Sequence, residues 1–110
     1  MDRLPPPVAH VVAQLEKGLR VLYGKRFREL LLYGSYARGQ ATEGSDVDLL
    51  LVLDGPVDPV REILRLEPIK WPLELDATLV LSVMPVSYQA FQRDETSFLH
   101  TVRREAVPAA

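Results

Sequence analysis

Two aspartates and a Gly-Ser pair are the residues whose types and spacing suggest chemistry. Asp46 and Asp48 flank a single valine at the start of an apolar run, and Gly34-Ser35 precedes them in the chain. Alternate side chains of an extended strand share a face, so we expect both carboxylates to point the same way. Because like charges repel and each carboxylate resists losing water, such a pair indicates a bound cation.

Mg²⁺ is the cation that best suits two neighbouring carboxylates, since it keeps several waters and takes further oxygens from substrate phosphates. A third acid, Asp76, lies in an apolar segment, residues 73–83, that we interpret as a strand. If this strand runs beside that of Asp48, three carboxylates can hold two metal ions. Glu74 would share the face of Asp76, and a purely structural role is open for either acid.

The Gly34-Ser35 pair offers groups that bind phosphate. Glycine permits close backbone approach, and the helix start that follows presents N–H groups to a phosphate oxygen. Ser35 adds a hydroxyl, and Arg38, one turn along, either reaches a phosphate or pairs with a nearby acid. Ser45 either contacts the nucleotide or stabilises the turn before the strand. No Gly-Lys-Ser/Thr follows, which argues against an ATPase-type phosphate loop.

Length and composition narrow the class of protein. The 110 residues with 47% apolar content favour one domain, residues 1–110. The absence of cysteine excludes disulfides, thiolate zinc sites and a cysteine nucleophile. A net charge of −2 argues against direct nucleic-acid binding. The longest apolar run, 49–53, cannot span a membrane and the N-terminus lacks a secretion signal, so we expect a soluble cytoplasmic protein without membrane contact.

Hydrophobic periodicity and turn residues predict the elements that position these groups. We expect an α/β (α+β) fold in which helices flank a small mixed β-sheet of about three strands. The first helix is predicted from Val8 until Gly24 ends it, and a short second helix is predicted to start with Ser35 as its cap. A third is predicted over 58–66 with Asp58 as its cap, and a fourth around 95–106. The strands are predicted at 27–33, 46–53 and 73–83. Trp71 is interpreted as core beside the third strand.

The stretch "GSYARGQATEGSDVDLLLVL" resembles the signature of the DNA polymerase β-like nucleotidyltransferases. It is most similar to the minimal nucleotidyltransferases within that superfamily, and the resemblance covers roughly Phe27 to Val83. The resemblance implies a nucleotidyltransferase fold and an ATP substrate. It implies that Gly34 and Ser35 bind nucleotide phosphates and that Asp46, Asp48 and Asp76 bind Mg²⁺ and catalyse transfer. Arg38 and Ser45 are further nucleotide-binding candidates from their positions beside the motif.

Members of this family transfer a nucleoside monophosphate to a hydroxyl and release pyrophosphate. The resemblance further implies that this chain is an antitoxin and forms a hetero-oligomer with a helical HEPN-type toxin. The antitoxin would neutralise the toxin by adding AMP to one of the toxin's tyrosines. Two alternatives stay open. The acceptor can be a small-molecule hydroxyl, such as that of an antibiotic, or the chain can be a non-catalytic module that neutralises its partner by occlusion.

Overall fold

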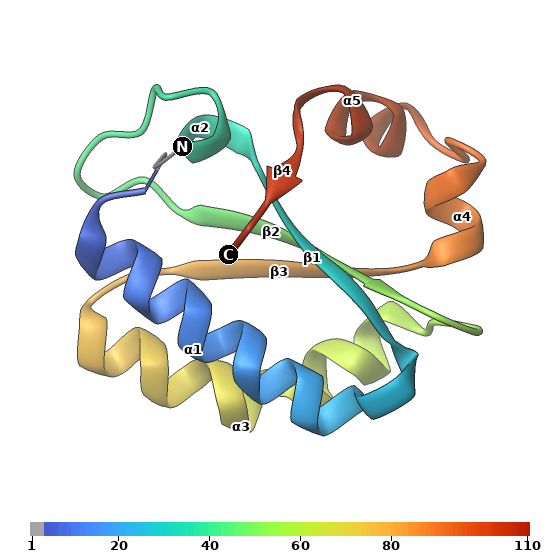
Figure 1. Cartoon of the computed structure of the whole chain (residues 1–110), viewed down its shortest axis with the longest axis horizontal. Coiled ribbons are helices and arrows are strands. Elements are labelled where there is room, and N and C mark those ends of the chain that lie inside the picture. Colours follow the sequence, from blue (N-terminus) through green and yellow to red (C-terminus); the bar gives the residue numbers. More distant parts are fainter. Residues whose placement is uncertain (1–3) are drawn as a thin grey trace.

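Four strands form one mixed sheet in the computed structural model, which describes residues 4–110 (Figure 1). The strand order is β3-β2-β1-β4; β2 runs parallel to β3, and β1 runs antiparallel to β2 and β4. The strands are β1 (Phe27–Tyr33), β2 (Val47–Leu53), β3 (Leu81–Ser87) and the two-residue β4 (Val107–Pro108). The helices are α1 (Pro6–Tyr23), α2 (Gly34–Ala37), α3 (Pro59–Ala77), α4 (Tyr88–Gln92) and α5 (Ser97–Glu105), with a 3-10 turn at Gly24–Arg26. The predicted mixed sheet flanked by helices is confirmed.

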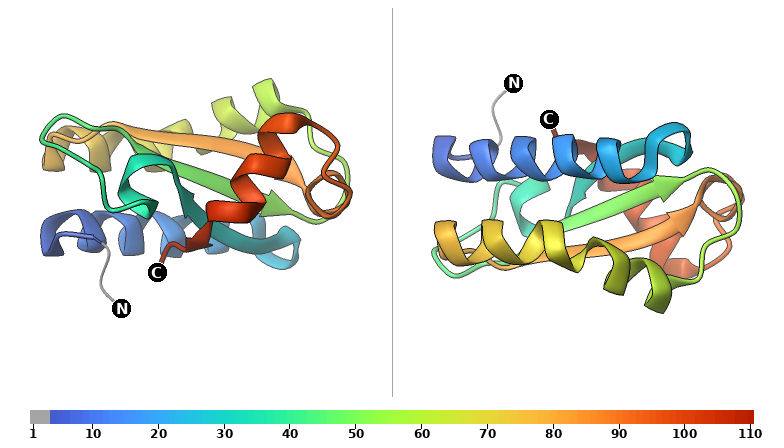
Figure 2. Two further views of the ribbon diagram at one scale, coloured as in Figure 1. Left: turned by 90° about the horizontal axis from the view of Figure 1, so that it is seen from above. Right: turned by 90° about the horizontal axis from the view of Figure 1, so that it is seen from below.

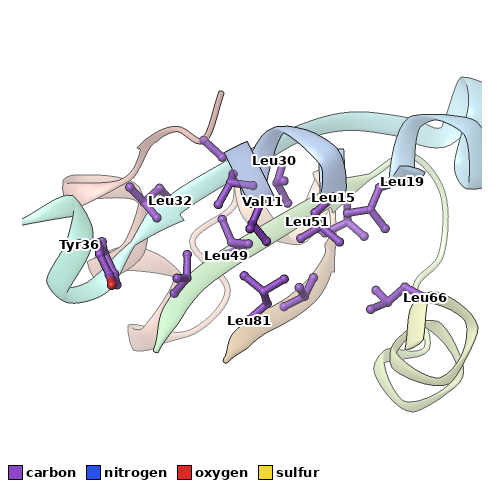
Figure 3. Packing of buried hydrophobic residues seen from close by; sticks show 14 of the residues in the cluster. Val11, Leu15, Leu19, Leu30, Leu32, Tyr36, Leu49, Leu51, Leu66 and Leu81 are labelled. Atoms are coloured by element: carbon purple, nitrogen blue, oxygen red, sulfur yellow. The ribbon is translucent and has the colours of Figure 1, made fainter. Parts of the chain in front are cut away.

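Both faces of the sheet are covered, which explains the unbroken apolar runs in β1 and β2. Leu49, Leu51 and Leu53 of β2 belong to the larger core under α1 and α3. Leu50 and Val52 belong to a smaller core that includes residues of α4 and α5. Figure 2 shows α5 on one side of the sheet and α1 with α3 on the other, and Figure 3 shows the side chains of α1 lying against those of β1 and β2.

Helix α1 ends as predicted before Gly24, whose φ is +55°. Its helical spacing buries Val8, Val11, Val12, Leu15 and Leu19, whereas Leu22, expected on the same face, is exposed. The predicted start of α3 is also confirmed, since Asp58 accepts a hydrogen bond from the backbone N–H of Arg61 and Pro59 is the first helical residue. Of the residues that the structure describes, none lies in a helix long and apolar enough to cross a membrane.

The strand predicted over residues 73–83 is wrong in its first half. Helix α3 continues to Ala77, and β3 begins only at Leu81. The alternating pattern misled the prediction because Leu66, Ile69 and Leu73 also follow helical spacing, and these side chains pack into the larger core. The exposed Pro68 and Pro72 lie within this helix without ending it. Trp71 consequently lies on α3 with 55% of its surface exposed, outside the core.

Two smaller expectations also differ from the structure. Helix α2 begins at Gly34 with Tyr33 as its N-cap, and no side chain caps it, so Ser35 is not the cap. Helix α5 is confirmed. Its spacing predicts Phe98, Leu99 and Val102 on one buried side, and Leu99 and Val102 are buried there, but Phe98 stays 43% exposed. The sequence did not predict the five-residue helix α4 or the short strand β4.

Candidate active site

Asp48 is the second residue of β2 and faces the side of the sheet that α5 covers, and Asp46 immediately precedes the strand. Val47, between them, is fully buried in the larger core. Asp48 lies on the same face of the strand as Leu50 and Val52, which pack into the smaller core beneath α5. Asp46 is exposed just ahead of the strand. The start of β2 therefore presents a carboxylate toward the α5 side, next to the turn from β1 into the first residues of α2 (33–35), which we call the Gly34 loop.

Gly34 and the Asp48 carboxylate are in direct contact across the adjacent strands β1 and β2. Gly34 is buried and has a φ of +75°, a backbone conformation that residues with a Cβ atom rarely adopt. A Cβ placed on Gly34 would overlap the carboxylate of Asp48. Glycine is thus required both by the backbone conformation and by the close approach, and the Gly-Ser pair and the aspartate form one site.

A hollow of about 380 Å³ opens beside this contact. Its walls come from β1, β2, the loop at Gly34 and α5. The lining residues are Tyr33, Gly34, Ser35, Arg38, Asp48, Phe98, Thr101, Val102 and Glu105. The rings of Tyr33 and Phe98 meet edge to face with their centroids 5.6 Å apart. The hollow therefore combines an apolar aromatic wall with acidic and basic groups.

The electrostatics of the hollow favour a cation. Partial burial raises the pKa of Asp48, the neighbouring charge of Asp46 raises it further, and Arg38 opposes the increase. Burial and the charge of Asp48 also raise the pKa of the Tyr33 phenol. Within residues 4–110 the side chains of Asp46 and Asp48 take part in no hydrogen bond and no ion pair. Arg38 thus offsets the repulsion only from a distance, and no cationic side chain of the described residues is in direct contact with either carboxylate.

The three polar candidates near the loop differ in their contacts. Ser35 lines the hollow, and its hydroxyl has no hydrogen-bond partner among the described residues. The Ser45 hydroxyl accepts a hydrogen bond of 2.9 Å from the Thr42 N–H, so it stabilises the turn before β2. Arg38 lies at the hollow and pairs with an acid, one of the two roles predicted for it.

That acid, Glu105, is the site residue that the sequence did not reveal. Its Oε2 accepts hydrogen bonds from the Gly34 N–H at 2.7 Å and from Nη1 of Arg38 at 3.1 Å. Glu105 is the last residue of α5 and follows Gly34 by 71 positions, so no local pattern joins the two. One feature of the sequence could have drawn attention to Glu105. It is an acid at the C-terminus of a predicted helix, where the helix dipole disfavours negative charge.

Asp76 is not brought to the pair. It lies exposed in the last turn of α3, not on a strand. Glu74, the alternative, has a structural role because it pairs with Lys70 at 3.0 Å and accepts from the Leu81 N–H at 2.8 Å. Ser82 is the β3 residue opposite Asp48. Residues 4–110 contain no group of three or more His, Cys, Asp or Glu that could hold a metal ion, so the expected three-carboxylate cluster is not present.

Comparison with known proteins agrees with this geometry. A family model described as "Nucleotidyltransferase domain" matches residues 12–102. The "Putative protein adenylyltransferase MJ0604" of Methanocaldococcus jannaschii is 38% identical over 52 residues, which cover 47% of this chain and 52% of that protein. The chain thus aligns with about half the length of this relative.

A solved structure supports the fold. The crystal structure of a protein from Sulfolobus solfataricus, described as a "putative nucleotidyltransferase", superimposes with a TM-score of 0.66. The alignment covers 92% of this chain and 78% of the other at 13% sequence identity. At this identity the likeness concerns the arrangement of helices and strands alone.

Proposed function

The chain belongs to the nucleotidyltransferase domain family, and on that premise we propose that it transfers AMP from ATP to a hydroxyl group of a protein in a Mg²⁺-dependent reaction. The observation that carries the proposal is the contact between Gly34 and the Asp48 carboxylate. It joins the Gly-Ser loop, suited to phosphate, to an acid suited to a metal ion. The nucleotide triphosphate and the metal ion can then bind next to each other.

The residues present fit Mg²⁺. Mg²⁺ in nucleotide enzymes is typically held by one or two carboxylates together with substrate phosphates and waters. Asp46 and Asp48 supply two carboxylates, and the repulsion that raises the pKa of Asp48 would be offset by a divalent cation. Bound there, the ion would neutralise phosphate charge and polarise the phosphoryl group under attack. Because no third acid joins Asp46 and Asp48, we propose one Mg²⁺ ion at this site.

The chain's own groups have distinct tasks in this proposal. The free hydroxyl of Ser35 donates to a phosphate oxygen, and Arg38 adds positive charge at the same hollow. The aromatic wall of Tyr33 and Phe98 excludes water from part of the site. In the transfer, the acceptor oxygen forms a bond to the α-phosphorus, the bond to pyrophosphate breaks, and the hydroxyl proton is released.

Two observations support a protein acceptor. The relative from Methanocaldococcus jannaschii is named for adenylyl transfer to protein. In addition, α3 exposes large apolar side chains along its length, namely Val60, Leu64, Trp71 and Leu75. Exposed apolar surface of this kind is typical of protein contacts. We propose that the acceptor is a tyrosine of a HEPN-type helical toxin, which would make this chain the antitoxin of the pair.

Thermal melts with and without Mg²⁺ and ATP test the metal site through Asp48→Asn. At a ligand concentration one hundred times Kd, the parent protein should gain about 2.7 kcal/mol of stability. We expect the variant to lose most of this gain and all transfer activity while it stays folded. The matched control is Asp54→Asn, the same change beyond the opposite end of β2, which should keep the parent's response. An equal ligand-induced shift in parent and Asp48→Asn would refute the metal site.

Label transfer tests the acceptor. The protein, the product of the adjacent open reading frame, Mg²⁺ and ATP labelled at the α-phosphate are incubated together. We expect label on a tyrosine of the neighbour and none with Asp48→Asn. If label instead reaches a small-molecule hydroxyl without the neighbour, the acceptor assignment is wrong. If the neighbour is neutralised with no transfer, the chain acts by occlusion.

A further inference from the structure

We propose that Glu105 is a positioning residue, which fixes the Gly34 loop and the Arg38 guanidinium in the arrangement that receives the nucleotide phosphates. This inference rests on the proposed function. It concerns a carboxylate that neither the aspartate pair nor the Gly-Ser motif contains. From α5, Glu105 contacts both groups that would bind phosphate, the Gly34 loop and Arg38.

The first contact fixes the loop backbone. Gly34 is buried, and Oε2 of Glu105 accepts its N–H at 2.7 Å. A buried N–H without an acceptor is unfavourable, so loss of Glu105 would let the loop move to find another partner. Because Gly34 lies directly against the Asp48 carboxylate, any such movement would also change the distance between loop and metal-binding acid.

The second contact orients Arg38 without using all of its donors. Its Nη1 donates to Glu105 and its Nε donates to Gln40 at 3.1 Å. Among the described residues Nη2 has no hydrogen-bond partner, and the arginine side chain is 46% exposed. The guanidinium is planar, so two fixed nitrogens define the direction of the third. Nη2 and the Ser35 hydroxyl thus remain available for phosphate while Glu105 stays in place.

The helix that carries Glu105 is itself held firmly. Leu99 and Val102 of α5 are buried in the smaller core, and Thr96 caps the helix by accepting from the Leu99 N–H at 3.1 Å. A site held by packed elements is more exact than one held by loops. The alternative is that Glu105 occupies the place of a phosphate and competes with it. The two roles predict opposite changes in nucleotide affinity.

Two substitutions at Glu105 separate these roles when Mg²⁺-ATP affinity is measured by calorimetry. Glu105→Gln keeps an oxygen acceptor for the Gly34 N–H but loses the charge that holds Arg38, and Glu105→Ala loses both. We expect Kd for Mg²⁺-ATP to rise by about tenfold or more in Glu105→Ala, as the loss of a charge-assisted contact implies, with Glu105→Gln between it and the parent. The control, Glu95→Gln, removes a surface pair with Arg93 and should bind as the parent does.

Hydrogen exchange of the Gly34 amide gives a second measurement that needs no ligand. Exchange should be faster in Glu105→Ala than in the parent and close to the parent in Glu105→Gln. Unchanged amide exchange, or unchanged or tighter Mg²⁺-ATP binding by both variants, would overturn the positioning role. If the parent itself fails to bind Mg²⁺-ATP, the proposed function fails, and amide exchange still decides whether Glu105 holds the loop.

Discussion

At the scale of single residues, the site depends on a negative charge that the fold compensates only in part. Asp48 is half-buried beside Asp46 and Glu105, with Arg38 as the opposing charge, and Arg38 is itself paired with Glu105. The ionised form of Asp48 is therefore less favourable in the folded protein than in the unfolded chain. Such a cost is typical of a group kept for binding a cation and not for stability.

This cost predicts a pH dependence of stability in metal-free buffer. The pKa of Asp48 is raised above its ordinary value of 3.8, so the folded state holds the proton more tightly than the unfolded state. The destabilisation is complete above the raised pKa and disappears as the pH falls through it toward 3.8. We expect Asp48→Asn to be more stable than the parent at neutral pH, with a difference that shrinks on acidification. Urea titrations of both proteins at a series of pH values measure this difference, and one that widens toward acid would contradict the assignment.

At the scale of elements, the end of one helix decides the geometry of a distant loop. Glu105 is the last residue of α5, and its carboxylate binds the first residue of α2. The start of α5 is fixed by the Thr96 hydroxyl, and its middle is fixed by two buried side chains. The position of Glu105 therefore depends on the capping and packing of the whole helix.

Removal of that cap has a measurable cost. Thr96→Ala should lower the free energy of unfolding by about 1 kcal/mol, because the Leu99 N–H loses its side-chain acceptor. Thr96→Ser keeps the hydroxyl and should stay near the parent. Urea-induced unfolding followed by circular dichroism gives both values. Equal stability of the alanine and serine variants would show that the cap does not stabilise α5.

At the scale of the whole molecule, stability and site are separated in space. The larger core lies under α1 and α3, whereas residues of α5 line the hollow. Figure 2 shows α5 on the side of the sheet opposite to α1 and α3. Helices α1 and α3 are joined by a buried polar contact, in which the Tyr23 hydroxyl donates to Glu62 at 2.9 Å. Arg26 and Arg65 also lie within ion-pair distance of this carboxylate, at 3.8 and 3.3 Å.

Tyr23→Phe tests this separation. The buried Glu62 carboxylate would lose one donor, so we expect a loss of about 1.5–3 kcal/mol in the free energy of unfolding. The Mg²⁺-ATP-induced stabilisation should be unchanged, because the contact lies on the opposite side of the sheet. Tyr36→Phe is the matched control for stability, since the Tyr36 hydroxyl has no hydrogen-bond partner in the part of the chain that the structure describes. A diminished ligand response in Tyr23→Phe would show that core and site are coupled.

The sequence by itself determined the features that depend on neighbours along the chain. The buried strands β1 and β2 follow from their apolar runs, the start of α3 from Asp58-Pro59, and the end of α1 from Gly24. The orientation of Asp48 away from the larger core follows from strand alternation, with buried Val47 beside it. The Gly-Ser pair and the aspartates were identified from the sequence because both lie in one short motif, residues 34–48.

Only the tertiary structure decided which distant groups join them. Residues 73–77 fit a strand and a helix equally well by local pattern, and packing of Leu73 against the larger core selected the helix, which removed Asp76 from the site. Glu105 entered the site because α5 packs across the sheet and ends beside Gly34. Local pattern carries no information about contacts made across 71 positions, since their energy exists only once the elements have packed together.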